Sequence, residues 1–225
     1  MNALIVYAHH EPSSFAAAML HTVIDTLQAS GHTVTVSDLY AMGFDPVSDR
    51  RNFRTVFDTT RLRQQAEEAH AAQIDGFAPP LSDEMRKLAE CDLLAFVFPI
   101  WWLGLPAILK GWVDRVFAAG VAYGGGRHFG NGVMRGKRAM CIVSTGGFTT
   151  DFHDSGHYAP IGTVLYPVHR GIFEFTGFEV LPPFVAHGPH RVTQEERSRM
   201  LGALRERVSQ IAVAAGTRGH APTAR

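Results

Sequence analysis

The chain has 225 residues, and 46% of them are hydrophobic, which is enough for a large buried core in one or two domains. Its 21 Lys and Arg residues balance its 21 Asp and Glu residues, so the charge gives no reason to expect binding to nucleic acid or to an anionic membrane. The two cysteines, Cys91 and Cys141, lie in apolar segments with no disulfide or zinc-site spacing, and we therefore expect a cytoplasmic protein.

The first part of the chain predicts a strand, a helix and a second strand. Residues 3–8 form an apolar run that is typical of a parallel strand covered on both faces. Ser13 or Ser14 is expected to cap the helix that follows, and Gly31 is expected to end it. Residues 33–36 are rich in β-branched side chains, which favour a strand. A right-handed βαβ crossover is the expected connection.

Residues 40–80 carry a weaker pattern. Five arginines precede Glu67 and Glu68, with few apolar residues between them. We interpret this segment as a surface excursion that contains some helix. The charge pattern leaves open whether the excursion covers a ligand or a partner subunit, or has no role.

Strands and helices alternate along the rest of the chain. Ser82 is expected to cap a helix over residues 83–90. Further strands are predicted over residues 93–98, 138–145 and 178–181. Further helices are predicted from near Pro106, over about residues 163–175, and after a capping box formed by Thr193 and Glu196.

Five buried strands that alternate with helices predict an α/β fold with a doubly wound parallel sheet. The loop after the first strand lacks a G-x-G-x-x-G motif, which disfavours a nicotinamide-binding Rossmann domain. A flavodoxin-like five-stranded sheet with the order 2-1-3-4-5 is the expected alternative. We predict a single domain over residues 1–216 and a disordered tail over residues 217–225.

A membrane span is not expected, although residues 93–109 carry no charge. Pro99, Gly104 and Pro106 interrupt this run, and it is shorter than the roughly 20 residues that cross a bilayer. The run is better explained as a buried strand, an aromatic loop and a helix N-terminus. These meet at the carboxyl edge of the sheet, where open α/β proteins bind ligands.

Three loops follow strands at this edge, and each offers a different kind of contact. Residues 9–15 lead into a helix N-terminus, whose free N–H groups favour a phosphate. Trp101 and Trp102 offer flat aromatic surface, whereas Gly146 and Gly147 let backbone N–H groups approach a ligand closely. Together these features predict a site for a phosphorylated planar heterocycle, for which a flavin is the obvious candidate.

Six segments resemble one protein family, in the same order along the chain: residues 8–15, 37–42, 98–117, 122–123, 144–147 and 171–178. They are similar to the NAD(P)H:quinone oxidoreductase (DT-diaphorase) family. The resemblance implies a flavodoxin-like homodimer with one FAD per subunit, in which each active site is completed by the other subunit. It also implies a ping-pong reaction, in which NAD(P)H gives hydride to flavin N5 and a quinone then accepts two electrons.

The same resemblance implies which residues contact the cofactor. The pyrophosphate would be held by His9, Ser13, Ser14 and Phe15. One side of the isoalloxazine ring would be lined by Pro99, Ile100, Trp101, Trp102 and Leu103, and its pyrimidine edge by Ser144, Thr145, Gly146 and Gly147. Two further positions that approach the flavin in the family are matched by Asp114 and Arg197.

The substrate pocket implied by the resemblance departs from the family pattern. Trp102 and Phe152 would face the substrate, and Tyr123 matches an aromatic residue that reaches the partner subunit's pocket. The family's second aromatic residue there, two positions on, is Gly125 in this chain, which predicts a more open pocket.

The proton relay of the family is also changed. Its tyrosine and histidine, six residues apart, stabilise negative charge on the reduced flavin, and they correspond here to Phe152 and Tyr158. Phe152 cannot donate a hydrogen bond, and His157 lies next to Tyr158. We therefore expect Tyr158 or His157 to be the catalytic group.

Other functions stay open at this point. An FMN-dependent azo- or nitroreductase has the same fold, and relatives act as regulatory ancillary subunits of bacterial potassium efflux systems. The second option is kept open by Phe152, which stands where the relay tyrosine is expected. The sequence favours neither NADH nor NADPH. No metal is expected, because no carboxylate or thiol completes a ligand set around the histidine pairs.

Overall fold

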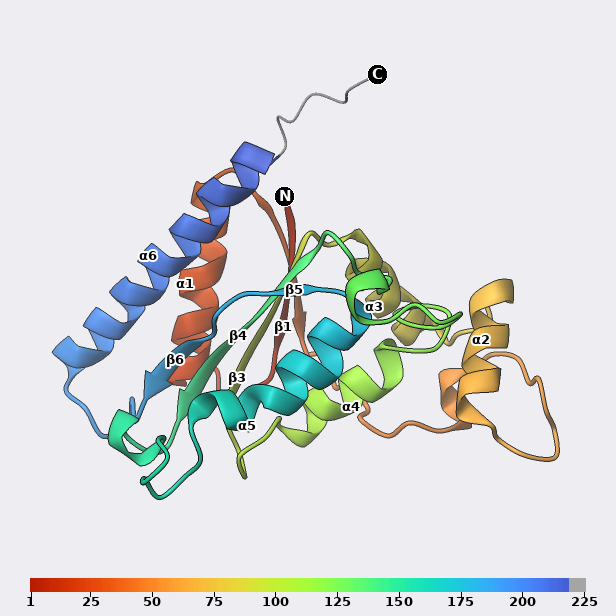
Figure 1. Ribbon diagram of the computed structural model, residues 1–225, viewed down its shortest axis with the longest axis horizontal. Coiled ribbons are helices and arrows are strands. Elements are labelled where there is room, and N and C mark those ends of the chain that lie inside the picture. Colours follow the sequence, from red (N-terminus) through yellow and green to blue (C-terminus); the bar gives the residue numbers. More distant parts are fainter. Residues whose placement is uncertain (219–225) are drawn as a thin grey trace.

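The computed structural model describes residues 1–218, and the side chains of residues 1–214. It has three layers, a central parallel sheet with helices against each face (Figure 1). The predicted α/β class and the doubly wound arrangement are confirmed.

The sheet has the predicted flavodoxin-like order. The first strand, β1 (Asn2–Tyr7), pairs with β2 (Thr33–Asp38) on one side and with β3 (Leu93–Pro99) on the other. Beyond β3 lies β4 (Arg138–Thr145), and all these pairings are parallel. Because β1, β3 and β4 are buried along most of their length, they read in the sequence as continuous apolar runs.

The fifth position of the sheet is divided between two short strands. Both β5 (Glu179–Val180) and β6 (Phe184–His187) pair with β4. Pro182 and Pro183 lie between them, and proline has no backbone N–H to donate to a ladder. The sheet therefore contains six strands where five were predicted, without a change in the order.

Two helices cover one face of the sheet, α1 (Phe15–Ala29) and α6 (Gln194–Arg218). The other face is covered by α3 (Pro79–Glu90), α4 (Ala107–Val116) and α5 (Ile161–Val168). A π-helical segment (His169–Glu174) continues α5. Three single-turn 3₁₀ helices lie at Arg50–Asn52, Phe129–Asn131 and Thr149–Asp151.

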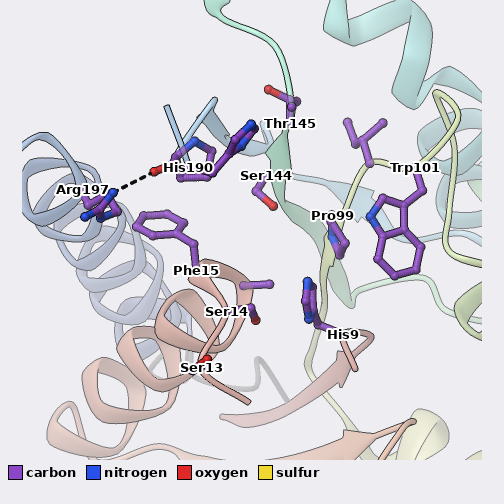
Figure 2. Close-up of a pocket in the computed structure, with 14 residues that line it drawn as sticks. His9, Ser13, Ser14, Phe15, Pro99, Trp101, Ser144, Thr145, His190 and Arg197 are labelled. Atoms are coloured by element: carbon purple, nitrogen blue, oxygen red, sulfur yellow. Dashed lines mark hydrogen bonds between the residues drawn. The ribbon is translucent and has the colours of Figure 1, made fainter. Parts of the chain in front are cut away.

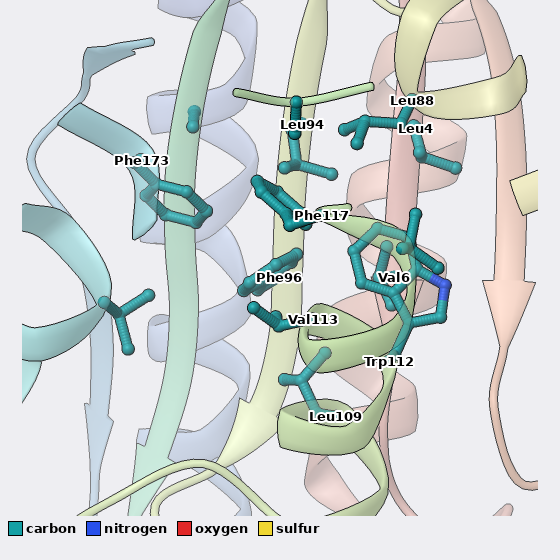
Figure 3. Packing of buried hydrophobic residues seen from close by; sticks show 14 of the residues in the cluster. Leu4, Val6, Leu88, Leu94, Phe96, Leu109, Trp112, Val113, Phe117 and Phe173 are labelled. Carbon is teal, nitrogen blue, oxygen red and sulfur yellow. The ribbon is translucent and has the colours of Figure 1, made fainter. Parts of the chain in front are cut away.

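Aromatic side chains fill the core between β3 and α4 (Figure 3). The Phe96 and Trp112 rings meet edge to face at 5.8 Å, and Phe173 packs on Phe96 from the other side. The indole N–H of Trp112 donates to the buried Glu84 carboxylate at 2.8 Å. Burial of a tryptophan is tolerated here because its only polar group has a partner.

Most helix starts follow the predicted capping residues. The Ala17 N–H donates to the Ser14 hydroxyl at the start of α1. Thr193 and Glu196 form the predicted reciprocal capping box before α6. The prediction for Ser82 was wrong, because α3 already begins at Pro79, a residue that suits a first helical position.

The segment over residues 40–80 contains α2 (Gln64–Ile74), which projects beyond the layered body (Figure 1). Buried polar contacts tie the segment to the body. The Glu68 carboxylate accepts the Ala119 N–H at 2.7 Å, and the Arg115 guanidinium donates to the Asn52 side chain at 2.8 Å. At the other end of the chain, α6 continues to Arg218. Residues 219–225 of the predicted tail lie outside the described residues.

Candidate active site

Two adjoining cavities lie at the carboxyl edge of the sheet, and they share Ile100, Thr145 and Gly146. The first, of about 670 Å³, is lined by His9, Ser13, Ser14, Phe15, Ala16, Pro99, Ile100, Trp101, Ser144, Thr145, Gly146, Pro189, His190 and Arg197 (Figure 2). The second, of about 390 Å³, is lined by Ile100, Trp102, Leu103, Thr145, Gly146, Gly147, Phe152 and Tyr158. The first cavity receives loops from β1, β3 and β4, where ligands of open α/β proteins bind.

Backbone donors are available where α1 meets the first cavity. Ser14 caps the helix, and the Ala17 and Ala18 N–H groups donate to it. Within the described chain, the N–H groups of Phe15 and Ala16 have no acceptor. Free donors at the positive end of a helix dipole favour an anion.

The serine next to the cap is already engaged. Both the hydroxyl and the backbone N–H of Ser13 donate to the Glu11 carboxylate, at 2.7 and 2.8 Å. These hydrogen bonds lower the pKa of Glu11. A ligand that takes the proton of the Ser13 hydroxyl must therefore displace Glu11.

His9 faces the first cavity with one defined donor. Its Nδ1 accepts the Glu11 N–H at 2.9 Å, which places the proton of the neutral ring on Nε2. Burial lowers the pKa of His9, and the neighbouring His10 acts in the same direction. At neutral pH, His9 therefore offers a neutral N–H donor.

A tight turn carries the two tryptophans. Trp101 and Gly104 exchange two backbone hydrogen bonds, of 3.2 and 3.0 Å. Trp102 and Leu103, between them, have φ angles of 52° and 56°, as both central residues of a type I′ turn do. The Trp102 side chain is fully exposed, with a relative accessibility of 102%. Trp101 lines the first cavity, whereas Trp102 and Leu103 border the second.

The two glycines after β4 differ in their surroundings. A Cβ atom added to Gly146 would meet nothing within 4 Å, so the space in front of this residue is open to a ligand. A Cβ atom added to Gly147 would lie 2.8 Å from the Asp151 carboxylate and 3.2 Å from the Phe152 ring. The packing of its own loop therefore requires glycine at position 147, whereas at position 146 the described chain leaves open space.

The loop after the glycines places one hydroxyl at the second cavity. The Phe152 and Tyr158 rings lie 5.0 Å apart, and both line the cavity. His157 does not line it: its side chain is 88% exposed and lies 3.5 Å from the Asp151 carboxylate. Of the two expected catalytic groups, the structure brings only Tyr158 to the cavity.

Two further predicted site residues lie away from both cavities. The Asp114 carboxylate pairs with Lys110 on the surface of α4, at 2.6 Å. Tyr123 packs edge to face on Phe175, with 5.8 Å between ring centroids. Every other predicted cofactor contact lines one cavity or both.

Three residues at the far end of the first cavity were missed by sequence reasoning. Ala16 follows the predicted loop directly, whereas Pro189 and His190 follow β6, a strand that was not predicted. The Arg197 guanidinium donates to the carbonyl oxygens of Pro189 and Val192, at 3.3 and 2.9 Å, and so closes this end of the cavity from α6. The short apolar run at 184–186 was the local signal for β6.

The described residues contain neither a cluster of metal ligands nor a membrane-spanning helix. Within residues 1–218, no three His, Cys, Asp or Glu side chains gather as metal ligands would. In the same part of the chain, no helix is both long and apolar enough to span a bilayer.

Known proteins are similar to this chain over most of its length. A family model described as a flavodoxin-like fold matches residues 1–208. The ribosyldihydronicotinamide dehydrogenase (quinone) of Pongo abelii is 37% identical over 209 residues, which cover 92% of this chain and 90% of that protein. NAD(P)H dehydrogenase (quinone) 1 of Cavia porcellus is 36% identical over 210 residues, which cover 93% of this chain and 76% of that protein.

A solved structure is similar to the same extent. A protein of Klebsiella pneumoniae, assigned as a quinone reductase, has a TM-score of 0.90 and 36% sequence identity. The likeness covers 94% of this chain and 85% of that one. By sequence identity, coverage and fold, the chain belongs to the flavodoxin-like family of NAD(P)H:quinone oxidoreductases.

Proposed function

We propose that this protein is an FAD-dependent enzyme that transfers two electrons from NAD(P)H to quinones. The observation that carries the proposal is the junction of the two cavities. Anion-binding donors line the first, aromatic side chains line the second, and the open space at Gly146 lies between them. Relatives more than a third identical are named as quinone dehydrogenases.

The first cavity suits a cofactor that carries phosphates. The unpartnered N–H groups of Phe15 and Ala16, together with the Nε2–H of His9, would bind the phosphate oxygens. The cavity then continues past the N-terminus of α1 to Pro189, His190 and Arg197. FMN ends at a single phosphate, so this extension favours FAD, whose second phosphate and adenosine would lie there.

Where the cavities meet, the chain would hold a flat ring. Pro99, Ile100 and Trp101 would face one side of the isoalloxazine, and Ser144 and Thr145 would lie at its pyrimidine edge. In the second cavity, Trp102 and Leu103 would line the same side of the isoalloxazine as Trp101. Gly147 would lie at the pyrimidine edge, next to Gly146. Bound FAD would supply two-electron chemistry at its N5 atom.

The second cavity would receive NAD(P)H and the quinone in turn, which is the ping-pong order. Trp102, Phe152 and Tyr158 would contact these substrates. Phe152 offers only its ring, so the Tyr158 hydroxyl would donate the hydrogen bond to a quinone carbonyl oxygen.

We further propose a homodimer with shared active sites. Trp102, beside the second cavity, is fully exposed, and Val56 and Phe57 of the excursion are more than half exposed. A second copy of the chain would cover these exposed apolar side chains. Tyr123 and Asp114, which lie away from the cavities of their own chain, would reach those of the partner. Because both cysteines are free thiols, we place the enzyme in the cytoplasm.

The test begins with the purified protein. We expect a flavin absorbance spectrum, release of FAD on denaturation, bleaching by NAD(P)H without oxygen, and recovery of colour with a simple benzoquinone. Sedimentation should give twice the 24.7 kDa of one chain. A colourless protein that takes up no added FAD would contradict the proposal. Bound flavin without turnover would favour a regulatory subunit, and released FMN would favour the azoreductase type.

A pair of variants tests the location of the flavin. Gly146→Val would place a branched side chain in the open space where the cavities meet, and it should abolish FAD binding. Gly202→Val is the matched control, because Gly202 lies on α6 and a Cβ there also meets nothing within 4 Å. Circular dichroism verifies that both variants fold. Full FAD binding by Gly146→Val would place the flavin elsewhere.

A further inference from the structure

His187 is the last residue of β6, and it is in register with Thr145, the last residue of β4. Its Nδ1 lies 3.3 Å from the Thr145 hydroxyl oxygen, which in turn lies 2.8 Å from the Gly147 carbonyl oxygen. The imidazole also packs against the Phe152 ring, with 5.5 Å between centroids. Because Thr145 lines both cavities and Phe152 lines the second, His187 supports the wall where the cavities meet.

The direction of these hydrogen bonds follows from the chemistry of a hydroxyl. The Thr145 hydroxyl has one proton, and only this proton can satisfy the Gly147 carbonyl oxygen, which cannot donate. The hydroxyl must then accept from His187, so the imidazole carries a proton on Nδ1. The result is a chain of two hydrogen bonds that run in one direction. The first runs from His187 Nδ1–H to the Thr145 hydroxyl, and the second from this hydroxyl to the Gly147 carbonyl oxygen.

We propose that His187 is a positioning residue that sets the orientation of the Gly146-Gly147 backbone toward the cofactor. The inference rests on the proposed function, because it concerns the loop that would face the flavin. Asp151 and Phe152 pack against Gly147 on one side, and the chain from His187 holds its carbonyl group on the other. The Gly147 carbonyl group belongs to the peptide between Gly147 and Phe148, whose N–H donates to the Asp151 carboxylate, so this peptide is held at both ends. The N–H of Gly147, in the preceding peptide, has no acceptor within the described residues and stays available to a ligand.

The charges around His187 agree with a neutral ring. Burial lowers the pKa of His187, and the nearby Asp151 carboxylate opposes this in part. Asp151 itself accepts the Phe148 N–H at 2.7 Å and lies 3.5 Å from His157. A neutral ring has one N–H, so the donation to Thr145 leaves Nε2 unprotonated.

The first experiment reads the tautomer in the protein without flavin. Long-range ¹H–¹⁵N correlation of labelled histidine should find the His187 proton on Nδ1 at neutral pH. Loss of the Thr145 hydroxyl in Thr145→Val should allow this proton to redistribute between the two nitrogens. A proton on Nε2 in the wild type would overturn the proposal, because Nδ1 could then only accept from Thr145.

The second experiment measures the dissociation constant of added FAD. His187→Phe removes the donor and should raise this constant about fivefold, as expected for the loss of one hydrogen bond. His187→Asn keeps an N–H near the position of Nδ1 and should restore binding to within about twofold of the wild type. Rescue by asparagine separates positioning from ring packing, because asparagine cannot replace the contact with Phe152.

Two further variants distinguish the loss of this hydrogen bond from a general loss of folding. Thr145→Val interrupts the chain at its middle, and its effect should not add to that of His187→Phe, because both remove the same connection. His21→Asn, on the exposed side of α1, is the control and should leave FAD binding unchanged. Full additivity, or equal FAD binding by His187→Phe and the wild type, would overturn the proposal. If the wild type binds no FAD, the proposed function fails. The tautomer measurement, which needs no flavin, still shows whether His187 donates to Thr145.

Discussion

Tyr158 and Phe152 lie side by side at the second cavity, and only one of them can donate a hydrogen bond. From the sequence alone, Tyr158 and His157 are equal candidates for the catalytic group, since they are neighbours in the chain. Their side chains have different surroundings. That of His157 is 88% exposed, whereas the Tyr158 ring packs at a tilt against Phe152 and lines the cavity.

We predict that Tyr158→Phe lowers kcat for quinone reduction about 100-fold, which is the lower end of a general-acid contribution. The ring and its packing against Phe152 are kept, so flavin binding should change little. Stopped-flow measurement of flavin reoxidation by a benzoquinone checks the effect. His157→Ala is the comparison variant, and a larger loss of rate there than in Tyr158→Phe would reverse the assignment.

The two thiols are predicted to be unreactive in the folded protein. Burial raises the pKa of Cys91 to about 11, and burial also raises the pKa of Cys141. The thiolate is the reactive form, and little of it is present at mildly alkaline pH. Titration with a disulfide reagent should detect neither cysteine in buffer and both in guanidinium chloride. Rapid labelling of either thiol without denaturant would contradict the burial of that side chain.

Among the elements, α4 depends most on a missing side chain. Gly111 lies in the middle of this helix, and a Cβ atom there would come within 2.4 Å of the Pro46 backbone. We predict that Gly111→Ala lowers the free energy of unfolding by about 2–3 kcal/mol, a typical cost of overpacking. Denaturant titration followed by far-UV circular dichroism measures it.

Gly202→Ala is the matched control for this prediction. Gly202 also lies within a helix, but a Cβ there meets nothing within 4 Å. Alanine should stabilise α6 by about 0.5–1 kcal/mol through its higher helix propensity. An equal loss of stability in both variants would show that the contact with Pro46 does not set the cost.

Elements marked by continuous local signals could be predicted from the sequence. The apolar runs predicted the strands β1, β3 and β4, and the serine and threonine caps located α1 and α6. The strand β6 could not be predicted, because two prolines break the local pattern and its pairing with β4 is a long-range interaction. Because β6 was not predicted, His187, Pro189 and His190 were not recognised as residues at or near the first cavity.

The same limit explains the site residues that were misjudged. Neighbouring residues in a loop, such as His157 and Tyr158, carry no periodic signal for which one faces a cavity. The engagement of Ser13 by Glu11 likewise depends on the shape of the loop and not on composition. The sequence could predict which loops meet, whereas the donors that remain free required the structure.

For the molecule as a whole, half-buried histidines link stability to pH. Burial lowers the pKa of His169, and the Nε2 atom of this side chain is buried with no hydrogen-bond partner among the described residues. Burial also lowers the pKa values of His9 and His187. Below the ordinary value of 6.5, the unfolded chain therefore takes up protons before the folded protein does.

We predict that the free energy of unfolding falls as the pH is lowered from about 7.5 to about 5.5. The sign follows from the lowered pKa values: the stabilisation is complete above 6.5 and is lost as the pH falls toward the folded-state values. His169→Leu, which removes one of the titrating rings, should make the profile flatter. Urea denaturation across this range provides the measurement. Parallel profiles for the two proteins would rule out His169 as a contributor.

The type I′ turn at Trp102 and Leu103 gives the wall of the second cavity a left-handed backbone. Both residues hold a backbone that costs L-amino acids about 1–2 kcal/mol each, and that β-branched side chains resist most. Mutant libraries aimed at new substrates should therefore lose valine, isoleucine and threonine at these two positions, whatever their fit to a quinone. A D-amino acid adopts a positive φ without this cost, so D-residues introduced by semisynthesis could widen the choice of side chains at this wall.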